Sequence, residues 1–210
     1  EWSGLVDGEP TTIDRDGLTD SIIRFSVSLY GAPPLKGKEF AAYRAEKAKS
    51  ETIVGAGLIL QLPTGQYYDD KLINLGSNRY TFRPQMGVLH SRGRFSMEAT
   101  GSLWLYTDND DFYGDVRLEN DPLYVLQGHL TYSIRPGLWL GTGLGYGYGA
   151  ESSIDGVNKD DKRKNLAWGG SVSYPITRQV GTKLTYIGTD SQASTGADTH
   201  TVAIAVSVLW

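Results

Sequence analysis

Six polar side chains stand where the chain alternates between polar and apolar residues, and they are the candidates for chemistry. They are Arg24, Arg83, Glu98, Gln127, His129 and Lys183. Because alternate side chains of a β-strand point to opposite faces, all six fall on the face turned away from the apolar residues. If that face encloses a narrow channel, the three basic residues oppose Glu98 and form a constriction that sets selectivity. An alternative that the residues leave open is that these charges are structural ion pairs and hydrogen bonds filling the interior.

Catalysis by histidine is the next chemistry to weigh. His129 is a candidate base, but Ser133, on the same face, lies four residues along an extended strand and is too far away to hydrogen-bond. His90 and His200 each adjoin a hydroxyl residue, yet adjacent residues of a strand point to opposite faces. We therefore expect no catalytic residue, and we expect that the protein is not an enzyme.

Two further patterns suggest ligands. Acidic residues at 69–70 and 108–111 could bind Ca²⁺, but their spacing does not match an EF-hand loop. A solvated loop, or bridging to lipopolysaccharide through divalent ions, is the interpretation we favour, and we expect neither a metal site nor a cofactor. The glycines from Gly141 to Gly149 recur with a period of two, which places them on one face of a strand rather than in a phosphate-binding loop. Such a stripe suits the close approach of another segment, for example the 107–121 loop folding inward.

The elements that position these residues are β-strands. Nine segments show alternation over the length that a tilted membrane strand needs. They lie near 23–29, 52–62, 79–88, 94–105, 124–134, 137–148, 165–176, 180–186 and 200–210, with a partial strand at 1–7. The last strand carries its apolar residues at alternate positions and stops on Trp210, as the closing strand of an outer-membrane barrel often does.

Composition narrows the class. No run of about 18 apolar residues exists, so no transmembrane helix is expected. The mean hydropathy of −0.31 is compatible with a membrane barrel, because polar residues facing the lumen dilute the average. Cysteine is absent and the net charge is −4, so neither a disulfide framework nor a nucleic-acid partner is expected. A soluble β-sandwich or lipocalin-like barrel also alternates, but the Gly and Ser opposite the apolar faces suit a narrow lumen better.

Connections between the strands alternate between short and long. Short turns fall at 91–93, 135–137 and 175–178, and long polar loops near 63–78, 107–121, 149–164 and 189–197. Outer-membrane barrels have short periplasmic turns and longer extracellular loops. One connection on the periplasmic side, 31–49, is long, and its helix formers predict a short periplasmic helix near 38–49. The aromatic residues Tyr67, Tyr68, Phe112 and Tyr113 would then lie at the extracellular entrance.

Several segments resemble a known family. They are Gly31-Ala32-Pro33-Pro34-Leu35 with Glu39-Phe40-Ala41-Ala42-Tyr43, Leu62-Pro63-Thr64-Gly65-Gln66-Tyr67, Asn74-Leu75-Gly76-Ser77-Asn78-Arg79, Asp108-Asn109-Asp110-Asp111-Phe112 and Gln127-Gly128-His129. In this order and spacing they are similar to the outer-membrane proteins named for the MetA pathway of phenol degradation, over residues 17 to 210.

The resemblance implies a barrel of twelve strands in the full-length family, of which about ten are expected in this chain. We expect one all-β, transmembrane antiparallel barrel domain over residues 1–210, lacking the N-terminal plug segment and the first strand or two. A ten-stranded closed barrel made by these residues alone stays open. The implied location is the outer membrane, and the implied function is uptake of small, rather hydrophobic molecules, aromatics included.

We expect these molecules to cross by passive diffusion through a monomeric protein. Its expected partners, besides the solutes, are outer-membrane lipid and lipopolysaccharide. Two alternatives remain open: a lipid-modifying outer-membrane hydrolase, and a structural barrel without transport.

Overall fold

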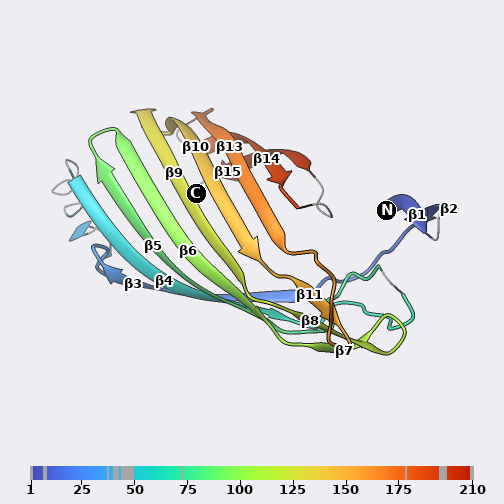
Figure 1. The fold of residues 1–210 in the computed structure, drawn as a ribbon. Helices are drawn as coiled ribbons and strands as arrows, with labels where there is room; N and C mark the ends of the chain where they lie inside the picture. The colour runs from blue at the N-terminus through green and yellow to red at the C-terminus, as the bar shows by residue number, and fades with distance from the viewer. Residues whose placement is uncertain are drawn as a thin grey trace.

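A single antiparallel sheet of nine long strands dominates the computed structural model, which describes residues 2–6, 9–36, 38–39, 43, 50–71, 73–177, 179–193 and 198–208 (Figure 1). The strands are β3 (Ser21–Tyr30), β4 (Ser50–Leu62), β5 (Thr81–Arg92), β6 (Phe95–Tyr106), β9 (Leu123–Arg135), β10 (Leu138–Gly149), β13 (Arg163–Pro175), β14 (Val180–Ser191) and β15 (Thr199–Val208). Within the sheet each strand pairs with its neighbours in chain order. The nine predicted strands are therefore confirmed.

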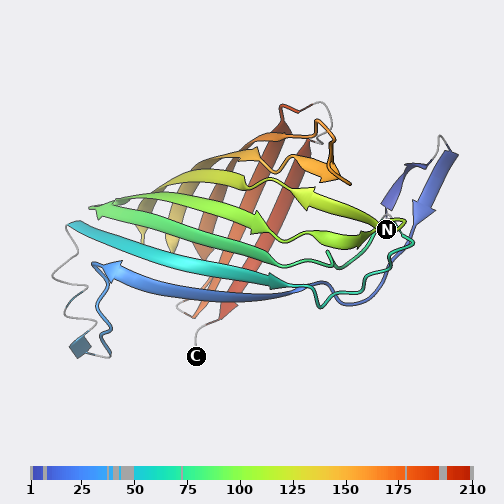
Figure 2. The ribbon, with the colours of Figure 1, turned by 60° about the horizontal axis from the view of Figure 1, so that its bottom comes forward.

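The sheet curves like the wall of a barrel but does not close among the described residues (Figure 2). Its edges are β3 and β15. The partial strand predicted at 1–7 is β1 (Trp2–Val6), which pairs with β2 (Glu9–Ile13) in a separate two-stranded sheet. The predicted partial strand is therefore present, but it lies outside the nine-stranded sheet, and the described residues do not form the closed ten-stranded barrel that the sequence left open.

The two faces of the curved sheet differ in exposure. Along β5, Phe82, Met86 and Val88 are 39%, 58% and 40% exposed, while the residues between them are more shielded. Side chains on the inside of a curved sheet are crowded together, so the shielded set lies on the inner surface, here called the concave face. The apolar set lies on the convex face. The predicted division into a polar and an apolar face is thus confirmed. Within the described residues, no helix is long and apolar enough to cross a bilayer.

The two ends of the sheet differ in their connections. At one end, here called the turn end, β5 meets β6 and β9 meets β10 through tight turns, in which Gly93 and Gly137 adopt φ of 60° and 78°. At the other, the loop end, two connections form a small four-stranded sheet of β7 (Asn109–Phe112), β8 (Val116–Asn120), β11 (Ser152–Ile154) and β12 (Val157–Asn158). The 107–121 loop therefore extends the wall at the loop end (Figure 1) and does not fold inward along the glycine stripe.

The connection from β3 to β4 lies at the turn end (Figure 2). Most of the helix predicted near 38–49 lies outside the described residues. Of that range only Lys38, Glu39 and Tyr43 are described, and all three are helical.

The ladder between β5 and β6 is interrupted at one point. Thr81 and Phe82 pair with β6, and pairing resumes at Gln85, but Arg83 and Pro84 have no paired residue there. Proline carries no backbone N–H to donate, which explains the gap. The interruption lies beside the charged residues of the concave face.

Candidate functional site

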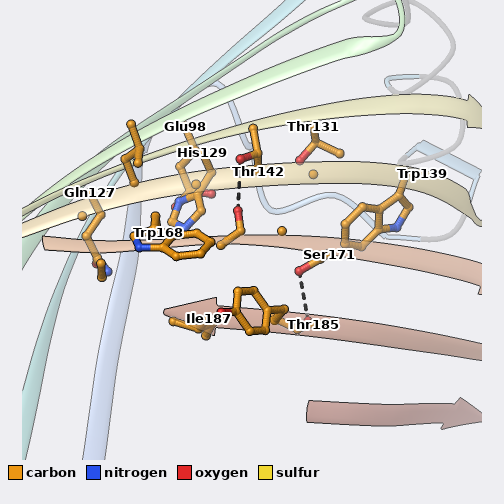
Figure 3. Close-up of a pocket in the computed structure, with 18 residues that line it drawn as sticks. Glu98, Gln127, His129, Thr131, Trp139, Thr142, Trp168, Ser171, Thr185 and Ile187 are labelled. Atoms are coloured by element: carbon orange, nitrogen blue, oxygen red, sulfur yellow. Dashed lines mark hydrogen bonds between the residues drawn. The ribbon is translucent and has the colours of Figure 1, made fainter. Parts of the chain in front are cut away.

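The middle of the concave face has a floor of glycines. Gly141, Gly143 and Gly145 of β10 adjoin Gly169 of β13 and line a pocket of about 360 Å³ (Figure 3). The ring of His129 lies over Gly143, where a Cβ atom would come within 2.5 Å of its Cδ2. The absent side chains thus leave space that a ligand or a neighbouring side chain can occupy.

The walls of this pocket combine aromatic and hydroxyl groups. Trp139 stands at one end, and the hydroxyls of Ser171 and Thr185 are hydrogen-bonded at 3.0 Å (Figure 3). Glu98 and Gln127 complete the lining on the side of β6 and β9. The predicted residues Glu98, Gln127 and His129 are therefore brought together.

Glu98 also borders a second pocket of about 250 Å³. Gly55, Gly57 and Gly87 line it, with Ile53 and Leu89. The two glycine-lined pockets lie on either side of this one carboxylate, which makes Glu98 the acidic group shared between them.

Arg24 and Arg83 form a separate basic group. Arg24 pairs with Ile59 across β3 and β4, and Ile59 pairs with Arg83 across β4 and β5. The guanidinium carbon of Arg83 lies 4.6 Å from the centre of the Trp104 ring, a cation–π contact. Three strands therefore present two arginines on the concave face with an isoleucine between them.

The predicted constriction would need Glu98 to meet the three basic residues. Instead, Glu98 pairs with Leu89, six residues along β5 from Arg83 or about 20 Å of extended chain. Lys183 pairs with Ser173, on a different row from Glu98. Among the described residues, no ion pair joins Glu98 to any of the three. The residues share a face, but the structure separates them along it.

A polar network at the loop end was not expected from the sequence. The Asp20 carboxylate accepts hydrogen bonds from the Gly65 backbone N–H at 3.0 Å, the Ser77 backbone N–H at 2.9 Å and the Gln61 amide at 2.9 Å. Partial burial of Asp20 raises its pKa, but hydrogen bonds led by the Ser77 hydroxyl outweigh this and leave the pKa below its ordinary value. Asp20 thus ties the start of β3 to the 63–80 connection.

Glycine is required where this connection folds back on itself. A Cβ atom at Gly65 or at Gly76 would lie 2.8 Å from backbone atoms of the other residue. Two of the segments that carry the family resemblance therefore meet at Asp20. That resemblance was the only sequence signal for this network.

Asn109 is the centre of a second network at the same end. It is 1% exposed, donates to the Tyr67 hydroxyl at 2.9 Å and accepts from the Asn78 amide at 2.9 Å. The Tyr67 hydroxyl donates to the Asp111 carbonyl at 2.9 Å. Tyr67, expected at an open entrance, is therefore engaged in joining two loops.

The other three expected entrance residues lie at the loop end as well. Tyr68 and Tyr113 are 48% and 51% exposed, and Phe112 is partly shielded. A backbone hydrogen bond of 3.2 Å from Gly114 to Asp69 brings their two loops together. An aromatic surface is thus available at this end of the sheet.

Acidic residues of the 107–121 loop surround a basic side chain. Arg117 hydrogen-bonds to Asp108 and lies 3.4 Å from Asp110 and 3.3 Å from Glu119. In the part of the chain that the structure describes, no group of three acidic, histidine or cysteine side chains is placed to hold a metal ion. The acidic residues here balance an arginine.

Two histidines lie on the convex face, each in a cross-strand pair. Thr52 and His90 are hydrogen-bonded at 2.8 Å, and so are Tyr186 and His200. Each pair satisfies polar atoms on a face that is otherwise apolar. Among the described residues, no ion pair joins an acidic side chain to either histidine.

A curved antiparallel sheet with an apolar convex face, a small and polar concave face, and short turns opposite long loops defines the wall of an outer-membrane β-barrel. Residues 3–205 match the family described as "Putative MetA-pathway of phenol degradation", and the chain belongs to that family. It is therefore a protein of the bacterial outer membrane, as the sequence predicts.

A solved structure supports this assignment. The chain is similar to an outer membrane channel from Pseudomonas putida F1, with 25% sequence identity and a TM-score of 0.75 over 93% of this chain and 68% of that one. The fold is thus that of an outer-membrane channel. None of the curated proteins matches the sequence.

Proposed function

We propose that this protein is a channel through which small, rather hydrophobic molecules, aromatic ones included, diffuse passively across the outer membrane. The observation that carries the proposal is the glycine-floored pocket of about 360 Å³ on the concave face, with Trp139 at one end. A flat apolar ring can approach a backbone that carries no side chains, and an aromatic wall adds stacking. The similar channel from Pseudomonas putida F1 supports transport rather than catalysis.

In this proposal the loop end faces the outside of the cell. Tyr67, Tyr68, Phe112 and Tyr113 border the entrance, where the two exposed tyrosines meet the solute first. The pore is lined by Arg24, Arg83, Glu98, Gln127, His129 and Lys183. The protein acts as a monomer in contact with outer-membrane lipid and lipopolysaccharide.

Uptake of toluene or phenol by cells with and without the intact protein tests the proposal, alongside single-channel conductance in planar bilayers. We expect faster aromatic uptake with little ion conductance. If the protein changes neither aromatic uptake by cells nor conductance in bilayers, the channel function is excluded. If a covalent serine probe then labels the protein, a lipid hydrolase is indicated. If the probe does not label it, a structural barrel is indicated.

A further inference from the structure

Two arginines of the concave face, Arg24 and Arg83, have no counter-charge among the described residues. Arg24 of β3 and Arg83 of β5 flank Ile59 of β4 in one row, so their backbones lie two strand spacings, or about 10 Å, apart. Within the described ranges, neither has an acidic partner within 4.0 Å. Arg83 is partly shielded and Arg24 is exposed, so an anion between them would be held by one partly shielded and one accessible guanidinium group.

Unsatisfied hydrogen-bond donors gather at the same place. The Nε atom of Arg83, the Nε1 atom of Trp104 and the hydroxyl of Ser102 are buried without a hydrogen-bond partner. Such groups are rare in folded proteins and mark a site where an acceptor is missing. They lie beside the interruption in the β5–β6 ladder, where Pro84 already removes a backbone donor.

An apolar pocket adjoins the two arginines. The next row of the concave face, Ser26, Gly57 and Gln85, begins the second pocket, of about 250 Å³. Its glycine floor and the side chains of Ile53 and Leu89 offer a flat, apolar space. Glu98 of β6 also borders the pocket. Its partner on β5 is Leu89, which lies six residues along that strand from Arg83.

We infer that Arg24, Arg83 and this pocket form a subsite for an aromatic monocarboxylate. The carboxylate lies between the two guanidinium groups, which match its geometry with paired N–H donors. The ring lies in the pocket, on the glycine floor. Trp104 acts as a positioning residue, because its ring holds the Arg83 side chain from the other side.

The lining of the pocket sets a further limit on the solute. A second carboxylate on the ring would enter a pocket whose described lining includes Glu98 and no basic side chain, so it would lose hydration without gaining a counter-charge. The subsite therefore favours a monocarboxylate over a dicarboxylate. This inference rests on the proposed channel function and names one class among its solutes.

Solute flux into proteoliposomes containing the intact protein tests the inference, with benzoate, terephthalate, acetate and benzyl alcohol as probes. Benzyl alcohol is the neutral counterpart of benzoate. The variants are Arg24→Gln and Arg83→Gln, with Arg92→Gln as the matched control. Arg92 is the last residue of β5, on the same strand as Arg83 but exposed and on the opposite face. Retention of the folded form on unheated gels checks that each variant is intact.

We expect saturable benzoate flux in the wild type, with acetate and terephthalate competing poorly. Arg24→Gln and Arg83→Gln should each raise the half-saturation concentration for benzoate roughly tenfold, because each removes a charged hydrogen-bond donor. In both variants benzyl alcohol flux should change much less than benzoate flux, and Arg92→Gln should behave as wild type for both solutes. Trp104→Leu should raise the half-saturation concentration without lowering maximal flux. Arg83→Lys should fall between wild type and Arg83→Gln, because it keeps the charge and loses the paired donors.

The two proposals fail in different ways. If benzyl alcohol crosses but benzoate flux is unsaturable, or is unchanged in both glutamine variants, the subsite is wrong and the channel stands. If acetate competes as well as benzoate, the arginines bind anions without using the pocket, and the aromatic assignment is wrong. If neither benzoate nor benzyl alcohol crosses with wild-type protein, the channel itself is wrong.

Discussion

The imidazole of His129 lies over the backbone of Gly143, so close that a Cβ atom at Gly143 would come within 2.5 Å of the ring. The two residues are direct cross-strand partners on β9 and β10. The glycine stripe of β10 therefore accepts, at this point, a side chain from its neighbouring strand. The size of the adjoining pocket depends on where that ring lies.

Gly143→Ala should move the His129 ring into the pocket. A side chain of this kind can rotate, so the fold should survive, with a loss of about 1–3 kcal/mol as for other overpacked sites. The moved ring would narrow the space above Gly141 and Gly145. We expect aromatic solute flux to fall several-fold, measured in proteoliposomes, and Gly143→Val to be more severe.

A matched substitution separates this effect from the general cost of replacing a strand glycine. Gly101 of β6 lies on the convex face, and a Cβ atom there would meet nothing within 4 Å. Gly101→Ala should leave flux unchanged. Truncation of the ring in the double variant Gly143→Ala with His129→Ala should restore flux. A double variant that stays as slow as Gly143→Ala would show that the ring is not the obstruction.

Asp20→Asn should loosen the 63–80 connection. An amide in place of the carboxylate turns one acceptor into a donor, which then faces the Ser77 and Gln61 donors. Hydrogen bonds to a charged group are worth about 1.5–3 kcal/mol, and partial exposure of Asp20 reduces the expected loss to about 1–2 kcal/mol. Faster hydrogen–deuterium exchange of residues 63–71 and 73–78 would reveal the change.

The loss of stability caused by Asp20→Asn should depend on pH. The folded-state pKa of Asp20 lies below its ordinary value, so its contribution to stability is present above the unfolded pKa of about 3.9 and is lost as the pH falls through the folded pKa. Wild type and Asp20→Asn should therefore differ most near neutral pH and converge in strong acid. A difference that persists unchanged at the most acidic pH would exclude this role of the carboxylate.

Alternation along the chain was sufficient to predict all nine strands and the faces of their residues, because the period of two is a local property. It could not predict which residues meet across strands. Glu98 and Lys183 share a face, but their distance depends on the register of four strand pairs, which no local pattern specifies. For that reason the sequence could not place the residues of the expected constriction relative to one another along the sheet.

The hydrogen-bond networks at the loop end could not be predicted from the sequence, for a different reason. Asp20 and Ser77 are 57 residues apart, and neither belongs to a periodic segment. The short strands β7, β8, β11 and β12 have two to five residues, too few to show a period. Only the resemblance to a family drew attention to the segments around Gly65 and Gly76.

Asn109→Ala should destabilise the loop end. The substitution removes the acceptor of the Asn78 amide and the donor to the Tyr67 hydroxyl, which keeps only its hydrogen bond to the Asp111 carbonyl, at a site that is 1% exposed. Each buried group left unsatisfied costs about 1–3 kcal/mol, so thermal unfolding in detergent should begin several degrees lower. Protease cleavage within 107–121 should also become faster.

The neighbouring residue provides the control for that prediction. The side chain of Asp110 is 73% exposed, and its Oδ1 atom lies 3.4 Å from the Nε atom of Arg117. Exposed ion pairs contribute about 0–1 kcal/mol, so Asp110→Ala should unfold like wild type. Equal sensitivity of the two variants would mean that the buried amide has no special part in joining the loops.

The convex-face pair of Thr52 and His90 allows a double-mutant cycle in a lipid-facing setting. Thr52→Val removes one partner and leaves the imidazole unsatisfied against lipid, so we expect a loss of about 1–3 kcal/mol. His90→Leu alone leaves the threonine hydroxyl unpaired, at a similar or smaller cost. The double variant places two apolar residues on an apolar face and should recover most of the stability, a coupling of about 1 kcal/mol or more. Reversible urea unfolding in lipid vesicles measures the free energy of unfolding of the wild type, the two single variants and the double variant. Strictly additive losses would indicate that the 2.8 Å contact contributes nothing on its own, and that both side chains lie where water already satisfies them.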